Sequence, residues 1–357
     1  MNKGIPLSQL ASMIETAAEQ QTDMLVPAQQ MEVLPIETDD GNKLAVDVKG
    51  KCFLEPTPLA QRQMATALGI PATYWDRCLE TSPELLAQNA NHWLQRDGAT
   101  RLVRTQDDHM RAYLSDRYKR LDNPMVLRQT LETIQSADTK VVALSSNVDN
   151  WGERMRLKIM FPEVYGEVRD GDTMRAGIEI SNSETGGGAF SVRPFLFRDF
   201  CYNGMIFGRQ AIPGMETLTR RHTGARMTEL WADDTLEAEV ELVARQTRDV
   251  VASMSSEESL TKLLEQCRRA AESAEAQDPE QTIQVLAKTY GLSDTERSKA
   301  LVNFIQDDDM TLWGAANAVT KVANDHASYE RSTELEALGS QLITMQMRDW
   351  DRIAVAA

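Results

Sequence analysis

Hydrophobic positions change their spacing several times within the first hundred residues. Residues 7–21 have the three-to-four-residue spacing of an amphipathic helix, and the polar, Gln-rich stretch that follows, to about residue 30, predicts a loose N-terminal arm. Alternating hydrophobic and polar positions predict a β-hairpin over residues 31–55. Prolines at first-turn positions then predict three short helices within residues 57–96.

The middle of the chain has the two-residue alternation that is typical of half-buried strands. The predicted strands cover residues 100–106, 109–121, 140–148, 153–161, 172–181 and 189–200. A helix is expected between the second and third of these, at about residues 124–135. Because short strands follow one another through tight turns, we expect them to form an antiparallel sheet.

From about residue 228 to the end, the pattern is almost entirely helical. After a long amphipathic helix, further helices are expected near residues 257–276, 280–291, 293–306, 311–324 and 330–346. Gly291 stands where one helix would end, and Ser293 stands where the next would be capped.

These patterns predict an α+β fold, with a central antiparallel sheet flanked by helices and an all-helical C-terminal region. The expected organisation is an N-terminal arm at residues 1–30, an α+β core at residues 31–226 with a helical insert at about 57–96, and a helical region at residues 227–357.

The composition narrows the class of protein. The 357 residues carry a formal net charge of −16, which argues against a generic nucleic-acid coat or a binder of anionic membranes. No apolar run approaches the length of a membrane span, and the N-terminus does not resemble a signal peptide. The four cysteines are scattered without a CxxC pair, as expected for reduced thiols. We therefore expect a cytoplasmic protein that does not associate with membranes.

The charge is distributed unevenly along the chain. Residues 99–226 hold 19 basic and 16 acidic residues, whereas the rest of the chain holds 19 basic and 38 acidic residues. Half of the basic side chains therefore lie in about a third of the chain. A local basic site is compatible with the acidic total.

One strand concentrates positive charge on a single face. Strand alternation places Arg154, Arg156 and Lys158 on one side and hydrophobic residues on the other. Like charges in a row repel one another unless an anion or acidic neighbours compensate them. The face is either a track for phosphates or a solvated face balanced by acidic side chains, with Glu179 as one candidate partner.

A second basic cluster lies in the strand pair that precedes it. Basic residues interleaved with tyrosines suit single-stranded nucleic acid, because cations neutralise phosphates and rings stack on bases. The candidate contacts here are Arg104, Arg111, Arg117, Tyr118, Lys119 and Arg120. The alternative is an edge segment whose tyrosines fill the core.

A third group of candidate contacts is Arg193, Arg198, Asn203, Arg220, Arg221 and His222. The run from Arg220 to His222 is expected just before the long C-terminal helix, close to the basic strands, where backbone N–H groups favour an anion. The alternative is that its arginines bridge to acidic residues of that helix, such as Glu237 or Glu241.

Other motifs do not indicate catalysis or metal binding. Cys201 with His222 could suggest a thiol hydrolase, but a thiol between Phe200 and Tyr202 is more typical of an inert position. The glycines at 186–188 lack the following Lys-Ser/Thr of a P-loop and predict a flexible hairpin tip. The aspartates at 307–309 suit a helix end and a cap. No cofactor, metal or catalytic residue is assigned.

Several segments, taken in order, are similar to one family. These are PATYWDRC (71–78), LVRTQDDHMRAYLSDRYKRLDN (102–123), FRDFCYNGMIFG (197–208), RRHTG (220–224) and TLWGAANAVTKVANDH (311–326). They resemble the phage- and plasmid-borne proteins grouped as domain of unknown function 932, over about residues 45–345. The resemblance implies DNA metabolism of a mobile element in a bacterial host. It also implies kinship with single-strand annealing recombinases, whose core is a curved antiparallel sheet packed on helices.

The leading hypothesis is a non-enzymatic protein that binds and anneals single-stranded DNA in mobile-element recombination or replication, and that works as a homo-oligomer. The alternative is a protein-interaction module, such as an anti-host or phage-assembly factor, with an acidic interaction surface. An enzyme whose site cannot be recognised from sequence also stays open.

Overall fold

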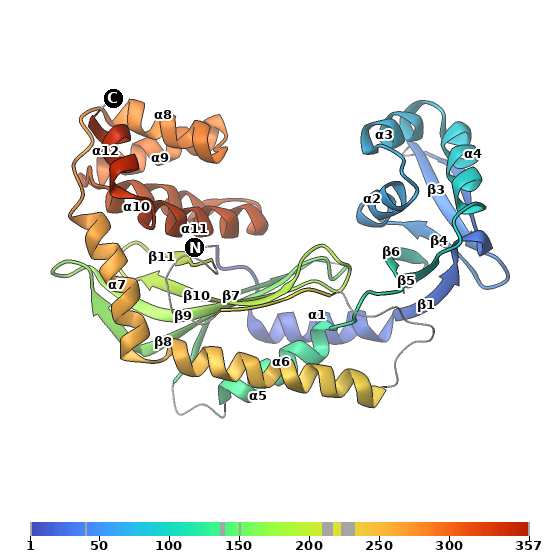
Figure 1. The fold of residues 1–357 in the computed structure, drawn as a ribbon, viewed down its shortest axis with the longest axis horizontal. Helices are drawn as coiled ribbons and strands as arrows, with labels where there is room; N and C mark the ends of the chain where they lie inside the picture. The colour runs from blue at the N-terminus through green and yellow to red at the C-terminus, as the bar shows by residue number, and fades with distance from the viewer. Residues whose placement is uncertain are drawn as a thin grey trace.

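The computed structural model describes residues 2–39, 41–135, 140–149, 151–208, 217–222 and 233–355. Within these residues the strands form two separate sheets, with helices packed on both (Figure 1). The predicted α+β class is confirmed. The single central sheet expected from the sequence is instead divided between two units of the fold.

The first sheet belongs to the N-terminal part of the chain. Its strands are β1 (Gln21–Pro27), β2 (Met31–Thr38), β3 (Gly41–Val48), β4 (Cys52–Pro56), β5 (Thr100–Gln106) and β6 (His109–Ser115), in the order β1-β5-β6-β4-β3-β2. The β4–β6 pair is parallel and the others are antiparallel. The stretch expected as a loose polar segment is strand β1, which pairs with β5 along its whole length.

Three helices cover this sheet, as the prolines predicted. They are α2 (Pro58–Ala67), α3 (Ala72–Thr81) and α4 (Pro83–Leu94). Their apolar residues, with Trp75 and Leu86 fully buried, pack against alternate strand residues such as Val46 and Val103. This unit therefore has a hydrophobic core of its own.

The second sheet is antiparallel throughout. Its strands are β7 (Val142–Val148), β8 (Met155–Glu167), β9 (Thr173–Asn182), β10 (Phe190–Arg198), β11 (Asn203–Ile206) and β12 (Leu218–Arg220). Neighbouring strands follow the order β11-β10-β9-β8-β7, and β12 also pairs with β10. Met155, Leu157 and Ile159 point into the main core, as the alternation in β8 predicted.

Helices lie on both faces of the second sheet (Figure 1). One face is covered by α1 (Leu7–Glu19), α5 (Asn123–Gln135) and α6 (Asp233–Met254). The other face is covered by α10 (Leu312–Val322) and α11 (Tyr329–Ile343). The remaining helices are α7 (Glu257–Ala271), α8 (Pro279–Tyr290), α9 (Asp294–Gln306) and α12 (Met347–Val355), and short 3₁₀ turns lie at Ala28–Gln30 and Ala323–Asp325.

The helix ends follow the signals in the sequence. Gly291 adopts a left-handed conformation, with φ of 69°, and terminates α8. Ser293 caps α9 in a reciprocal capping box with Glu296. In the described part of the chain, no helix combines the length and apolarity needed to cross a membrane.

Candidate nucleic-acid interface

The predicted basic face of β8 is covered by α11. The guanidinium of Arg156 donates to Glu179 of β9 at 2.7 Å and to Glu330 of α11 at 2.6 and 2.9 Å. Arg193 of β10 donates to the other oxygen of Glu179 at 2.9 Å. Burial alone would raise the pKa of Glu179, but Arg193 and Arg156 outweigh it and lower this pKa to about 2. Glu179 is therefore the acidic partner that the alternative interpretation named.

Lys158 is buried more deeply than its neighbours on this face. Its ammonium group donates to Glu336 of α11, and both side chains are fully buried. The ring of Tyr329 lies 5.0 Å from the same ammonium group. Arg154, directly before the first residue of β8, is partly exposed, and its Nε lies 4.0 Å from Oε1 of Glu330. Of the three predicted phosphate contacts on β8, only Arg154 reaches solvent.

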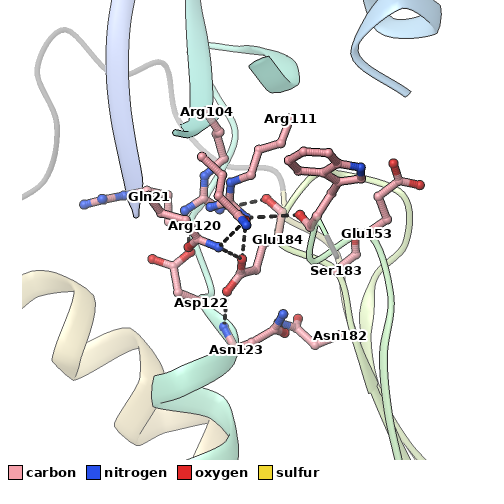
Figure 2. Close-up of polar contacts among 12 residues, drawn as sticks. Gln21, Arg104, Arg111, Arg120, Asp122, Asn123, Glu153, Asn182, Ser183 and Glu184 are labelled. Carbon is pink, nitrogen blue, oxygen red and sulfur yellow. Dashed lines mark hydrogen bonds and ion pairs between the residues drawn. The ribbon is translucent and has the colours of Figure 1, made fainter. Parts of the chain in front are cut away.

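A second set of charges lies where the two sheets meet (Figure 2). We call Asp23, Arg104, Arg111, Asp122 and Glu184 the charge cluster. Arg104 of β5 donates to Asp23 at 2.8 and 3.0 Å, to Asp122 at 2.6 Å and to the carbonyl oxygen of Glu184 at 2.7 Å. These partners hold β1, β5 and the loop after β9 together.

Glu184 lies at the centre of the charge cluster, between Arg111 and the start of α5 (Figure 2). It accepts a hydrogen bond from Arg111 and another from the backbone N–H of Asn123 at 2.6 Å. Burial and the neighbouring Arg104 lower the pKa of Arg111, against the attraction of Glu184. Among the described residues, the Nε and Nη2 groups of Arg111 have no hydrogen-bond partner. Arg104 and Arg111 are both buried, so a nucleic-acid strand in solvent could not contact them. The prediction that they bind nucleic acid is wrong for these two residues.

The loop that carries Glu184 is the glycine-rich connection between β9 and β10. Ser183, Glu184 and Thr185 are buried, and Gln63 of α2 donates to the carbonyl oxygen of Thr185 at 2.7 Å. A Cβ on Gly188 would lie 1.8 Å from the guanidinium of Arg154. The Arg154 side chain therefore occupies space that any residue other than glycine at position 188 would fill. The predicted hairpin position is confirmed, but the first half of the loop is packed against the N-terminal unit.

Two basic segments that are about a hundred residues apart in sequence lie side by side. The backbone N–H of Lys119 donates to the carbonyl oxygen of His222 at 3.0 Å. In return, Nδ1 of His222 lies 3.2 Å from the carbonyl oxygen of Lys119, which makes Nδ1 the protonated nitrogen. We call this surface the basic edge; its residues are Arg117, Lys119, Arg120, Arg220, Arg221 and His222.

The side chains of the basic edge differ in exposure. Arg117 and Arg221 are exposed, and Arg120 is partly buried against Asp23 at 3.0 Å. Burial lowers the pKa of His222, so this ring adds no charge at neutral pH. It stacks on Tyr118, with ring centroids 5.2 Å apart. Tyr118 is itself buried and donates to the carbonyl oxygen of Ser183 at 2.9 Å. Its ring therefore packs under His222 and is not available to stack on a base.

The remaining predicted contacts lie at the far end of β10. Arg198 donates to Asp172 at 2.6 and 2.8 Å and packs over the ring of Trp313. Asn203 is buried and donates to the side chains of Asn317 and Thr320 in α10. These residues bind the sheet to the C-terminal helices. The expectation that Arg220 directly precedes a helix falls on residues 223–232, outside the described residues.

A protein-family model described as a domain of unknown function (DUF932) matches residues 111–342, which is more than half of the chain. The chain belongs to the DUF932 family. The match begins in β6 and ends in α11, so it includes the second sheet, the basic edge and Glu184. No curated protein and no solved structure matches the chain significantly.

This DUF932 protein has a second exposed feature at the turn between β10 and β11. The rings of Phe200 and Tyr202 are 76% and 70% exposed, and Tyr202 has a positive φ of 51°. The nearby arginines are already paired, Arg198 with Asp172 and Arg175 with Asp199. We call Phe200 and Tyr202 the aromatic tip. A tip with paired arginines offers apolar area rather than free positive charge.

The structure of this DUF932 protein also bears on the motifs that were set aside. Cys201 and His222 belong to opposite ends of the second sheet, since β10 separates the β10–β11 turn from the Phe190–Arg220 pair. Among the described residues, no group of three or more His, Cys, Asp or Glu side chains is arranged to hold a metal ion.

Proposed function

We propose that this DUF932 protein binds single-stranded DNA through the phosphate groups, at the basic edge. The observation that carries the proposal is the joining of two distant basic segments by the Lys119–His222 backbone pair, with Arg117 and Arg221 exposed on it. A planar guanidinium can donate two parallel hydrogen bonds to one phosphate, which makes arginine well suited to this contact.

The acidic remainder of the chain supports a narrow contact rather than a broad one. Outside residues 99–226 the chain has 38 acidic and 19 basic residues, which gives this part of the chain a net charge of −19. A rigid duplex pressed against the surface would meet this negative field, whereas a flexible single strand can follow a short basic edge. Annealing of two strands, in phage or plasmid recombination or replication, is the part of the proposal that rests on the family resemblance.

Assembly into a homo-oligomer completes the proposal. A short basic edge binds few phosphates, so one copy alone holds a strand weakly. Several copies along one strand would gain avidity without any new contact.

The binding of labelled single-stranded DNA should weaken steeply as the salt concentration rises. Each phosphate contact contributes a slope of about −0.7 in a plot of log affinity against log salt, so the two exposed arginines, Arg117 and Arg221, predict about −1.4. Fluorescence anisotropy from 50 to 200 mM salt measures the slope, and light scattering of the same samples reports the assembly. No binding at 50 mM salt would contradict the proposed function, and a complex whose mass corresponds to a single 40.0 kDa chain plus one DNA strand would contradict the assembly.

The aromatic tip favours a second candidate function, a protein-interaction module. Exposed Tyr, Phe and Arg side chains are enriched at protein interfaces, and the paired arginines leave little charge for a phosphate there. The salt series separates the two candidates, because a protein-interaction module would show no salt-dependent affinity for single-stranded DNA.

A further inference from the structure

A pocket of about 340 Å³ lies between α1 and the charge cluster. Its apolar wall is formed by Met13, Ile14, Ala17 and Val148. The volume falls at the lower end of the range for small-molecule sites, which would accommodate one heteroaromatic ring with its sugar. The floor is built from buried residues, since Glu184 and Asn123 are 1% and 2% exposed.

The polar side of the pocket contains amides that are poorly engaged. The Nε2 group of Gln21 reaches Gln106 and Glu184 only at 3.4 Å each. An amide both donates and accepts hydrogen bonds, as do the edges of the nucleobases. A ligand that offers both kinds of group would replace these long contacts with shorter ones.

The charges around the pocket set the orientation of a ligand. Glu184 and Asp149 line the pocket, and their carboxylate oxygens, which already accept from Arg111 and from backbone N–H groups, have no donor to offer a phosphate. Arg120 of the basic edge is three residues from Asn123 in the pocket floor, so their Cα atoms are at most about 11 Å apart. A nucleotide bound here would place its base in the pocket and its phosphate toward Arg120 and the other arginines of the basic edge.

We propose that this pocket binds one unstacked nucleobase of a strand held at the basic edge. The carboxylates favour bases that carry an exocyclic amino group, which are cytosine, adenine and guanine, over thymine. The apolar wall covers the face of the ring, as apolar side chains do where a base leaves its stack. The inference rests on the proposed function for the strand, but the pocket can be tested with free nucleosides alone.

The experiment fills the pocket without touching the basic edge. Ala17→Trp places a large ring in the apolar wall, and Ala18→Trp is the matched control, because Ala18 is the next residue of α1 and is not part of the lining. Saturation-transfer NMR with deoxycytidine or thymidine reports nucleoside binding. An oligonucleotide containing 2-aminopurine reports unstacking by a rise in fluorescence.

The wild type and Ala18→Trp should bind deoxycytidine in preference to thymidine and raise the 2-aminopurine signal. Ala17→Trp should lose the deoxycytidine signal and bind the oligonucleotide about ten-fold more weakly, as expected for the loss of one base contact. If Ala17→Trp fails to fold, Gln106→Leu takes its place as the test, because it removes only an amide from the pocket lining. This variant should also weaken deoxycytidine binding.

The outcomes separate the two proposals. Oligonucleotide binding with a deoxycytidine signal that neither variant changes would overturn the base pocket and leave the basic edge standing. Deoxycytidine binding that Ala17→Trp abolishes, without any oligonucleotide binding, would support the pocket and contradict the proposed function.

Discussion

Replacing Lys158 with methionine should lower the free energy of unfolding by about 3–5 kcal/mol, since it leaves the carboxylate of Glu336 buried without its cation. Both side chains are fully buried, and Oε1 of Glu336 already has no partner among the described residues. Water cannot compensate the lost charge at this depth. Denaturant unfolding of the single variant at neutral pH measures the cost.

Two further variants control this prediction. The double change Lys158→Met with Glu336→Leu should recover most of the stability, because no uncompensated charge remains. Lys140→Met is the matched surface control: Lys140 pairs with Glu163 at 2.8 Å, but both side chains are well exposed. This change should cost less than about 1 kcal/mol. A single Lys158 variant as stable as the Lys140 variant would contradict a structural role for the buried pair.

Acid should remove about 3 kcal/mol of stability through Glu179 alone. Its pKa rises from about 2 in the folded protein to about 4.5 in the unfolded chain. A carboxylate with a lowered folded pKa stabilises the fold above the unfolded pKa, and this contribution is lost as the pH falls toward the folded pKa. The loss should begin near pH 4.5 and reach about 2 kcal/mol at pH 3.

Glu179→Gln isolates this contribution from those of other carboxylates. At pH 6 the variant should be less stable than the wild type by several kcal/mol, since Arg193 loses its carboxylate and Arg156 keeps only Glu330. The difference should shrink by about 2 kcal/mol toward pH 3, because Glu179 becomes protonated in the unfolded wild-type chain while it stays ionised in the folded protein. Denaturant unfolding at both pH values provides the comparison, and a difference that does not change with pH would show that folding does not lower the pKa of Glu179.

The strand face at 154–158 illustrates how far the sequence reaches. Alternation correctly separates the core side of β8 from its charged side, because the two-residue period is a local property. It does not show what covers the charged side. The partners Glu330 and Glu336 lie about 175 residues later in the chain, on a helix whose position depends on long-range packing.

The same limit applies to the sheets and to the charge cluster. Helix ends at Gly291 and Ser293 were predictable, since caps depend on neighbouring residues. The parallel β4–β6 pair and the pairing of β1 with β5 join distant segments and leave no local pattern. Glu184 was missed as a central residue, although a lone carboxylate two positions before a run of three glycines was a signal in the sequence.

The most direct test of the proposed function compares two pairs of exposed arginines. Arg117→Ala with Arg221→Ala removes the exposed cations of the basic edge. Arg348→Ala with Arg352→Ala removes the same charge from α12, where the two side chains are 71% and 80% exposed. The affinity for labelled single-stranded DNA is measured over the same salt series. Loss of two phosphate contacts should make the slope shallower by about 1.4 for the first variant, while the second keeps the wild-type slope. Equal slopes for both folded variants would contradict DNA binding at the basic edge.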